Sequence, residues 1–273
     1  MRSNLALIKM GGSVVTFKNR PLSANYMAIG EIMKAITLLK GIPIILVHGG
    51  GSFGHYWSVK YNMHTRSDKY DSHGISIVHE SMTHLNQIII NSMIKNGLNP
   101  YSVSAFAFTN GKIPFKTKLK QLYAIAKTGL IPVTYGDVVH INDGKFSILS
   151  GDVIMTMIAK ILNPSKVIFT VNTEGIYRDI GKKEIIREVT SAVVKNAGLF
   201  RSTRSQPFPD IPDITGGMSR KVKEAIKIST IGAEVMIVNG LKPERIIQAV
   251  YSGPENFEGT VVIGRGRSLQ SKK

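Results

Sequence analysis

Short apolar runs rich in β-branched residues alternate along this chain with longer amphipathic stretches. The short runs predict buried strands, at residues 5–10, 42–49, 101–108, 131–141, 144–151, 166–171 and 233–240. The longer stretches have helical periodicity and predict helices, at residues 25–40, 75–96, 116–128, 152–161 and 218–230. Strands that alternate with helices predict an α/β fold, in which an open, mostly parallel, twisted sheet is sandwiched by helices in three αβα layers.

The chain has 273 residues, enough to bury a large core. Neither an internal repeat nor a long linker divides it. We therefore expect one domain, residues 1–273, with two lobes that cover approximately 1–165 and 166–265. The segment 197–214 is rich in proline and lacks periodicity, which predicts a surface loop.

Composition excludes several classes of protein. The chain has no cysteine, so disulfides and thiolate metal sites are excluded. No apolar run approaches the roughly 18 residues that span a bilayer, and the apolar run at the N-terminus is too short for a signal peptide. We expect a cytoplasmic protein without membrane contact.

The formal charge of +17 is large, and it has two interpretations. Clustered lysines and arginines bind nucleic acid, whereas a dispersed basic surface is solvated and attracts anionic substrates. The basic residues are spread along the chain, with mild concentrations at 112–127 and in the C-terminal tail. No RNA-binding motif with interleaved aromatics is present, so the pattern does not favour nucleic acid as the main partner.

Glycine clusters follow four of the predicted strands, at Gly11-Gly12, Gly49 to Gly51, Gly151 and Gly216-Gly217. In open parallel sheets, ligands bind beyond the carboxyl ends of the strands. Glycine turns before helices place backbone N–H groups where an anion can bind. The four clusters therefore predict one long crevice for phosphate groups.

Two motifs supply candidate cations beside these glycines. In "KMGGS", Lys9 lies in an otherwise apolar strand, so its charge must meet an anion or a carboxylate. Lys18 could reach the same point, although a surface lysine would look the same. In "HGGGSFGH", His55 could donate to a phosphoryl oxygen, or it could cap a helix or bond within the core.

Two further motifs carry an acid and a lysine. In "SGD", Asp152 could be a helix cap, or it could orient lysines or a metal-bound phosphate. In "DITGGMSRK", Lys221 is predicted one turn into a helix, where it could meet the outer phosphates of a nucleotide or decorate the surface.

Taken in order, these motifs resemble the amino acid kinase superfamily. The resemblance covers roughly residues 5 to 263 and also includes "YGDVV" and "EGIY". It is closest to the archaeal isopentenyl phosphate kinases, because "HGGGSFGH" ends in a histidine that acetylglutamate kinases usually lack. The chain departs from the usual motifs at Phe17, Val153, Asn172 and Glu174.

The resemblance implies ATP-dependent phosphorylation of isopentenyl phosphate to the diphosphate, with ATP and Mg²⁺ as cofactors and a homodimer as the assembly. The lobe at 1–165 would bind the acceptor, and the lobe at 166–265 the nucleotide. The implied catalytic residues are Lys9, Lys18 and His55, and the acceptor would be held by Gly50, His55 and Gly151, with its tail in an apolar pocket near the helix that begins around Ile75. The implied ATP-binding residues are Lys9, Met10, Gly11, Gly12, Ser13, Gly51, Asp152, Asn172, Tyr177, Gly217 and Lys221, and no protein ligand to a metal is implied.

Two other functions stay open. One is a kinase of the same fold that acts on another small phosphate, a phosphonate or a carboxylate. The other is a regulatory or nucleic-acid-binding protein built on a kinase fold, which the +17 charge and the replaced acids motivate.

Overall fold

The computed structural model describes residues 2–63, 70–109, 114–142, 144–179, 184–190, 217–253 and 256–264. The predicted surface loop 197–214 and Gly216 lie outside the described residues.

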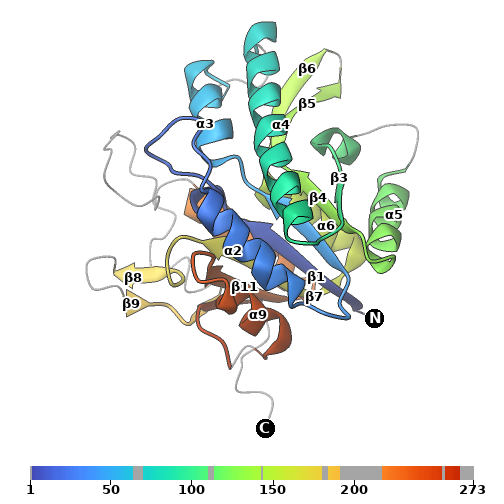
Figure 1. The fold of residues 1–273 in the computed structure, drawn as a ribbon, viewed down its shortest axis with the longest axis vertical. Helices are drawn as coiled ribbons and strands as arrows, with labels where there is room; N and C mark the ends of the chain where they lie inside the picture. Colours follow the sequence, from blue (N-terminus) through green and yellow to red (C-terminus); the bar gives the residue numbers. More distant parts are fainter. Residues whose placement is uncertain are drawn as a thin grey trace.

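A twisted sheet of eight strands runs through the described part of the chain (Figure 1). In spatial order the strands are β10 (Glu188–Thr190), β12 (Thr260–Ile263), β11 (Glu234–Asn239), β7 (Pro164–Val171), β1 (Ser3–Met10), β2 (Ile44–His48), β4 (Ile131–Tyr135) and β3 (Pro100–Ser102). The six strands from β11 to β3 are parallel, whereas β12 is antiparallel to β11 and pairs in parallel with β10. The predicted mostly parallel sheet is confirmed.

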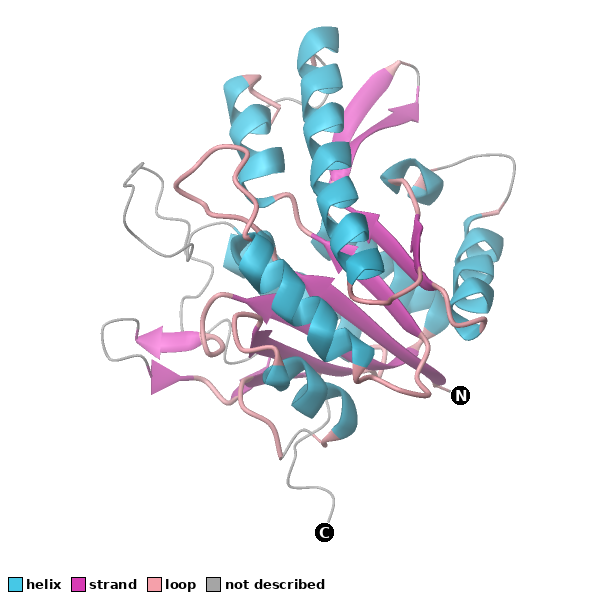
Figure 2. Cartoon of the chain, in the orientation of Figure 1, coloured by secondary structure: helices cyan, strands magenta, loops and turns pink. Residues whose placement is uncertain are grey.

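Helices cover both faces of this sheet and complete the three predicted layers (Figure 2). One face is covered by α2 (Tyr26–Thr37), α4 (Ser72–Lys95) and α9 (Glu244–Tyr251). The other is covered by α5 (Phe115–Lys127), α6 (Gly151–Leu162) and α8 (Gly217–Ser229). The smaller elements are α1 (Gly12–Val15), α3 (Gly51–Lys60), the 3₁₀ helix η1 (Ala105–Phe108) and the hairpins β5 (Asp137–Asn142) with β6 (Lys145–Leu149) and β8 (Tyr177–Asp179) with β9 (Glu184–Ile185).

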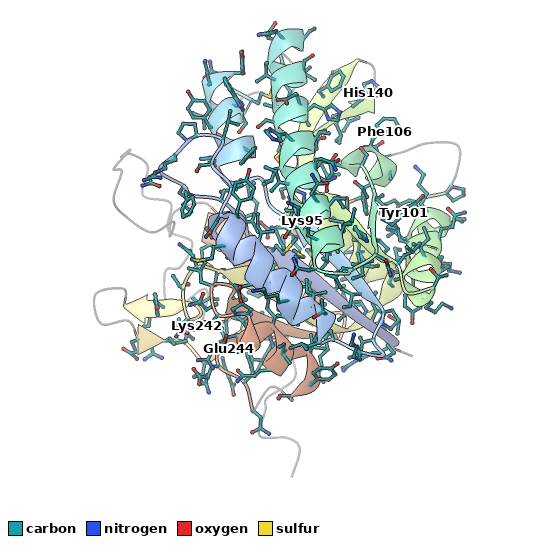
Figure 3. All side chains as sticks on the ribbon, in the orientation of Figure 1. Lys95, Tyr101, Phe106, His140, Lys242 and Glu244 are labelled. Carbon is teal, nitrogen blue, oxygen red and sulfur yellow. The ribbon has the colours of Figure 1, made fainter. Side chains whose placement is uncertain are left out.

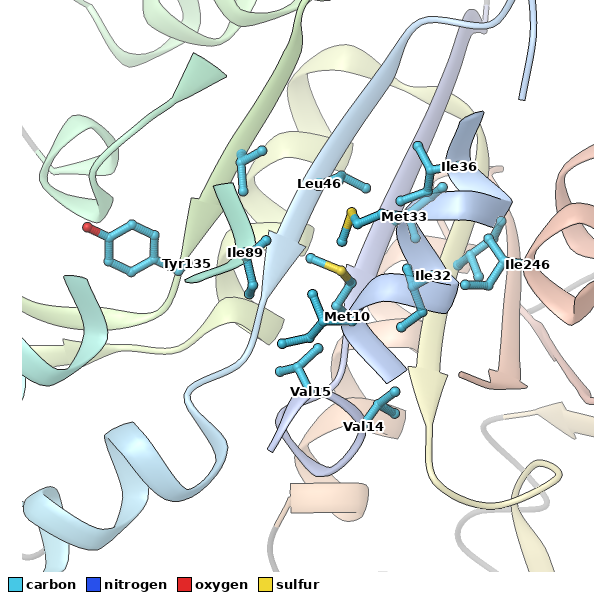
Figure 4. Packing of buried hydrophobic residues seen from close by; sticks show 14 of the residues in the cluster. Met10, Val14, Val15, Ile32, Met33, Ile36, Leu46, Ile89, Tyr135 and Ile246 are labelled. Atoms are coloured by element: carbon cyan, nitrogen blue, oxygen red, sulfur yellow. The ribbon is translucent and has the colours of Figure 1, made fainter. Parts of the chain in front are cut away.

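The alternation of side chains along β1 decides which of them reach the site. Ile8 and Met10 point into the core beneath α2, where Figure 4 shows Met10 beside Ile32 and Met33. Leu5 and Leu7 pack on the opposite face, beneath α6. Lys9 shares the face of Leu5 and Leu7 because successive side chains of a strand alternate, so its ammonium group reaches the beginning of α6 rather than α2.

Two predicted strands are wrong in extent. Residues 101–108 form a strand at 100–102 followed by η1, in which the Ser104 side chain caps the helix by accepting from the Phe106 N–H. Residues 131–141 form two strands, because the chain leaves the main sheet at Gly136. A side chain at Gly136 would lie 2.8 Å from the Gly151 nitrogen, so the backbone can turn there only without one.

Candidate active site

Two lysines from separate elements meet one buried carboxylate at the carboxyl edge of the sheet. Lys9 of β1 donates a hydrogen bond to Asp152 Oδ1, and Lys221 Nζ of α8 lies 3.6 Å from the same oxygen. All three residues are buried. Asp152 is in the first turn of α6, but the cap of that helix is Ser150, whose hydroxyl accepts from the Val153 N–H. Asp152 therefore orients lysines and does not cap the helix.

The electrostatics of Lys9, Asp152 and Lys221, which we call the charged trio, favour an additional anion. Burial would raise the pKa of Asp152, but Lys221, Lys9 and Arg220 together outweigh it and hold that pKa at about 2. Burial lowers the pKa of Lys9 to about 8 although Asp152 opposes the change, so Lys9 is still mostly protonated at pH 7. Two cations and one anion leave the trio with a net charge of +2 − 1 = +1. A buried excess charge is costly unless a further anion pairs with it.

The glycine turns after β1 and β2 lie in direct contact with each other. A Cβ on Gly49 would lie 2.8 Å from the Gly12 nitrogen, and one on Gly51 would lie 2.6 Å from the Gly12 oxygen. Gly51 also has a φ of +48°, which glycine adopts without strain. The density of glycine is thus explained in part by the close packing of the two turns against each other, and not only by a ligand that approaches the backbone.

The same turns begin two helices whose cap residues are glycines, and in the first turn of α3 the Ser52 N–H instead donates to Thr16 Oγ1. The cap residues are Gly11 for α1 and Gly50 for α3, and neither has a side chain that could accept from the first backbone N–H groups. Gly151 completes this arrangement, since its Cβ position lies 3.1 Å from the His48 oxygen and 3.3 Å from the Lys9 Cε. The turns after β1 and β2 and the start of α6 therefore meet beside the Lys9 side chain.

The two histidines of "HGGGSFGH" have opposite environments. His48 is fully buried, stacks on Tyr135 and lies 3.3 Å from Asn86 Oδ1, and burial lowers its pKa to about 4, so it is neutral. His55 lies within α3 and is exposed. The alternatives in which His55 caps the helix or lies in the core are therefore wrong, because those positions belong to Gly50 and His48.

The remaining predicted residues lie around this edge. Met10 is buried at the end of β1, Ser13 lies in α1, and Lys18 lies in the exposed loop that leads to α2. Asn172 is exposed directly after β7, Tyr177 begins β8, and Gly217 begins α8. The structure brings Lys9, Gly151, Asp152 and Lys221 together, whereas Asn172 and Tyr177 have no hydrogen bond or ion pair with the charged trio within the described part of the chain.

Glu174, one of the departures from the usual motifs, is already paired. It lies 2.7 Å from Lys242 Nζ and accepts from the Asn239 amide at 3.0 Å, and these bonds lower its pKa. Lys242, labelled in Figure 3, lies between β11 and α9. Glu174 therefore holds the loop after β7 against the end of β11.

Sequence reasoning missed two sets of charged residues near the site. Arg220 adds positive charge next to the charged trio, and its position beside Lys221 in "SRK" was the available signal. Asp137 is buried, and its Oδ2 lies 2.6 Å from Nδ1 of His79 on α4. Burial raises the pKa of Asp137 to about 6 although His79 opposes the change. Nothing in the sequence links residues so far apart.

Among the described residues, no group of three histidines, cysteines or acids could hold a metal ion. In the same part of the chain, no helix is long and apolar enough to cross a membrane.

Known proteins match this chain along almost its whole length. The sequence profile of the amino acid kinase family matches residues 4–239. An isopentenyl phosphate kinase of Thermoplasma acidophilum is 31% identical over 94% of this chain and 100% of its own length, and an acetylglutamate kinase of Dehalococcoides mccartyi is 23% identical over 96% of each chain. A crystal structure of the T. acidophilum isopentenyl phosphate kinase product complex is similar with a TM-score of 0.74 at 28% identity, over 94% of this chain and 99% of that one. The chain therefore belongs to the amino acid kinase family and, within it, to the isopentenyl phosphate kinases.

Proposed function

We propose that this chain transfers the γ-phosphoryl group of ATP to the phosphate of isopentenyl phosphate, which gives isopentenyl diphosphate and ADP. The observation that carries the proposal is the charged trio, a buried site with an excess positive charge beside contacting glycine turns. The similarity to isopentenyl phosphate kinases indicates isopentenyl phosphate as the acceptor. The charged trio provides the positive charge that stabilises a phosphoryl group during its transfer.

The reaction needs charge neutralisation more than it needs a base. A phosphate monoester has a second pKa near 6, so the acceptor is already largely an oxyanion at neutral pH. It must nevertheless approach the negative γ-phosphate, and the repulsion is strong where water is excluded. Lys9 and Lys221, oriented by Asp152, would stabilise the equatorial oxygens of the transferring group. The backbone N–H groups at the starts of α1 and α3 would bind oxygens on either side.

We assign the two substrates to different parts of this edge. ATP would contact Lys9, Met10, Gly11, Gly12, Ser13, Gly51, Asp152, Asn172, Tyr177, Gly217 and Lys221. The acceptor phosphate would lie against Gly50 and Gly151 and accept a hydrogen bond from His55, whose exposure on α3 leaves its ring available. Lys18 would reach the transferring group from its loop. The two-lobed division, with the acceptor bound by 1–165 and the nucleotide by 166–265, remains part of this proposal.

Mg²⁺ would enter this site on ATP. Asp152 is engaged by two lysines and Glu174 by Lys242 and Asn239, which supports a site in which no acid of this chain holds the ion. We propose that phosphate oxygens hold the ion, whose contribution is to neutralise their charge.

An acceptor panel tests the proposal. ADP release is measured with isopentenyl phosphate, other small phosphates, a phosphonate and N-acetylglutamate, each with ATP and Mg²⁺. We expect the largest kcat/KM with isopentenyl phosphate, because His55 favours a dianionic phosphate over a carboxylate. A larger value with N-acetylglutamate would assign the chain to carboxylate kinases. No stimulation by any acceptor, with tight RNA or DNA binding at physiological salt, would favour the nucleic-acid-binding alternative.

We also propose that the chain forms a homodimer and works in the cytoplasm, where its co-substrate ATP is abundant. The edge strand β3 pairs with β4 on one side, and exposed apolar side chains surround it at Ile94, Tyr101 and Phe106. Figure 3 shows Tyr101 and Phe106 on the same side of the molecule in this view. Light scattering after size exclusion tests the dimer, and Phe106→Glu should produce the monomer. A monomer in the unmodified protein would contradict it.

A further inference from the structure

A second polar contact joins α6 and α8 one turn beyond the charged trio. Asp152 lies in the first turn of α6 and Lys221 in the second turn of α8, with Lys221 Nζ 3.6 Å from Asp152 Oδ1. Further along both helices, Thr156 Oγ1 donates to Glu224 Oε2 at 2.6 Å. Thr156 follows Asp152 by four residues, so these two side chains share one face of α6. Glu224 follows Lys221 by three residues, so they share one face of α8. The two contacts are successive cross-links between the same helices.

Thr156 and Glu224 are buried, and both carboxylate oxygens of Glu224 accept a hydrogen bond. Thr156 is 5% exposed and Glu224 is 6% exposed. The second carboxylate oxygen, Oε1, accepts from Lys227 Nζ at 2.6 Å. A carboxylate between two helices carries a desolvation cost that an apolar contact would avoid. Around it, both helices contribute apolar side chains to one buried cluster, such as Ile158 of α6 and Ala225 of α8.

A hydrogen bond of fixed length constrains two helices in a way that apolar contacts do not. Apolar side chains tolerate small shifts because their attraction is not directional. A hydroxyl and a carboxylate hold their partners within a narrow range of distance and angle. A sliding of α8 by a fraction of a turn would carry Lys221 away from Asp152 and Lys9, and a misplacement of about 1 Å can lower a rate by about 10²-fold.

We propose that Thr156 and Glu224 are positioning residues, which fix the register of α8 against α6 and thereby hold Lys221 beside Asp152. Neither residue touches the substrates in this proposal. The inference rests on the proposed function, because it assigns Lys221 to the phosphoryl groups of ATP.

The test compares two variants of Thr156 with a matched control. Thr156→Val keeps the shape of the side chain and removes its hydroxyl, while Thr156→Ser keeps the hydroxyl. The control is Ser229→Ala, which removes a buried hydroxyl of α8 that bonds to Ile226 of the same helix and not to α6. For each protein, ATP affinity is measured by calorimetry, and kcat, the KM of each substrate and the melting temperature are also determined.

We expect Thr156→Val to lower kcat about tenfold and to weaken ATP binding several-fold, with the KM for isopentenyl phosphate unchanged. Thr156→Ser should restore both properties. Ser229→Ala should lower the melting temperature by a similar amount and leave kcat and ATP affinity unchanged. Equal kcat and ATP affinity in Thr156→Val and Ser229→Ala would overturn the proposal, since the hydrogen bond would then be purely structural.

A second variant keeps the proposal testable if Thr156→Val does not fold. Glu224→Gln retains an oxygen that accepts from Thr156, so it should keep kcat within about twofold of the unmodified protein. A tenfold loss would show that the charge of Glu224 matters and not the register, and would overturn the proposal. If the unmodified chain binds ATP but does not phosphorylate isopentenyl phosphate, the proposed function fails, and the ATP affinities of the variants still decide this inference.

Discussion

Asp152→Asn removes the one anion of the charged trio while it keeps the size of the side chain. Asp152 has a pKa of about 2 against an ordinary 3.8, and the difference corresponds to about 2 kcal/mol of native-state stabilisation at neutral pH. The amide also leaves Lys9 and Lys221 buried without an opposite charge, and breaking a buried pair costs about 3–5 kcal/mol. We therefore expect a loss of about 2–4 kcal/mol at pH 7, which lowers the melting temperature by roughly 5–10 °C.

The pH dependence of this loss has a definite sign. The folded-state pKa of Asp152 is depressed, so its stabilisation is complete above pH 3.8 and disappears as the pH falls toward 2. The difference in stability between the unmodified protein and Asp152→Asn should accordingly persist at pH 5–7 and vanish toward pH 2. A matched control is Glu234→Gln, which breaks the partly exposed pair with Lys166 and should cost less than about 1 kcal/mol.

Steady-state kinetics of the same variant distinguish the orientation of Lys9 and Lys221 from the electrostatic attraction of the site for ATP. Asp152→Asn raises the net charge of the site, so the KM for ATP should not increase, whereas kcat should fall about 10²-fold because Lys9 and Lys221 are no longer oriented. Urea unfolding and steady-state assays measure the two effects. A folded Asp152→Asn protein with unchanged unfolding free energy, or with kcat near that of the unmodified enzyme, would refute the reasoning.

Three further predictions concern single residues of the site. Lys9→Ala should lower kcat by about 10²-fold or more with little change in the acceptor KM, and near-normal turnover of the variant would contradict this role. In the unmodified enzyme, kcat/KM for ATP should fall above pH 8, where Lys9 loses its proton. His55→Ala should raise the acceptor KM and lower kcat while ATP affinity stays constant, and His55→Gln should keep part of the activity; a change in stability alone would count against the contact. Gly51→Ala should lose about 2–4 kcal/mol of stability, because φ is +48° and a Cβ would overlap the Gly12 oxygen. The control Gly97→Ala, where φ is +74° and the space around the Cβ is open, should lose less stability. Equal losses in the two variants would show that φ alone matters.

Periodicity identified five of the six described helices that cover the two faces of the main sheet, namely α2, α4, α5, α6 and α8. The apolar spacing of α2, α4, α6 and α8 and the apolar runs of β1, β2, β7 and β11 are strong local signals, and each matches an observed element. Residues 101–108 misled because alternating apolar residues suit a strand, yet Ser104 offers a cap and starts a 3₁₀ turn. Helix α9 went unpredicted, because it has eight residues and begins at a lysine-proline step.

The residues of the site were easier to name than their contacts. A charged Lys9 inside an apolar strand already required an anion or a carboxylate, and Asp152 supplies it. The contact between Gly12 and Gly51 depends on how β1 and β2 pair, which local sequence does not encode. The same holds for Thr156 with Glu224, since their separation of 68 residues is bridged by the packing of α6 on α8.

The transfer of label from ATP to the acceptor tests the central claim most directly. The protein is incubated with isopentenyl phosphate, Mg²⁺ and ATP labelled in the γ-phosphoryl group. The product is isolated, and the position of the label in it is determined by phosphorus NMR. The account predicts isopentenyl diphosphate with the label in its terminal phosphoryl group, at a rate that Lys9→Ala lowers about 10²-fold or more. Release of the label as inorganic phosphate, or its transfer to N-acetylglutamate in preference to isopentenyl phosphate, would contradict it.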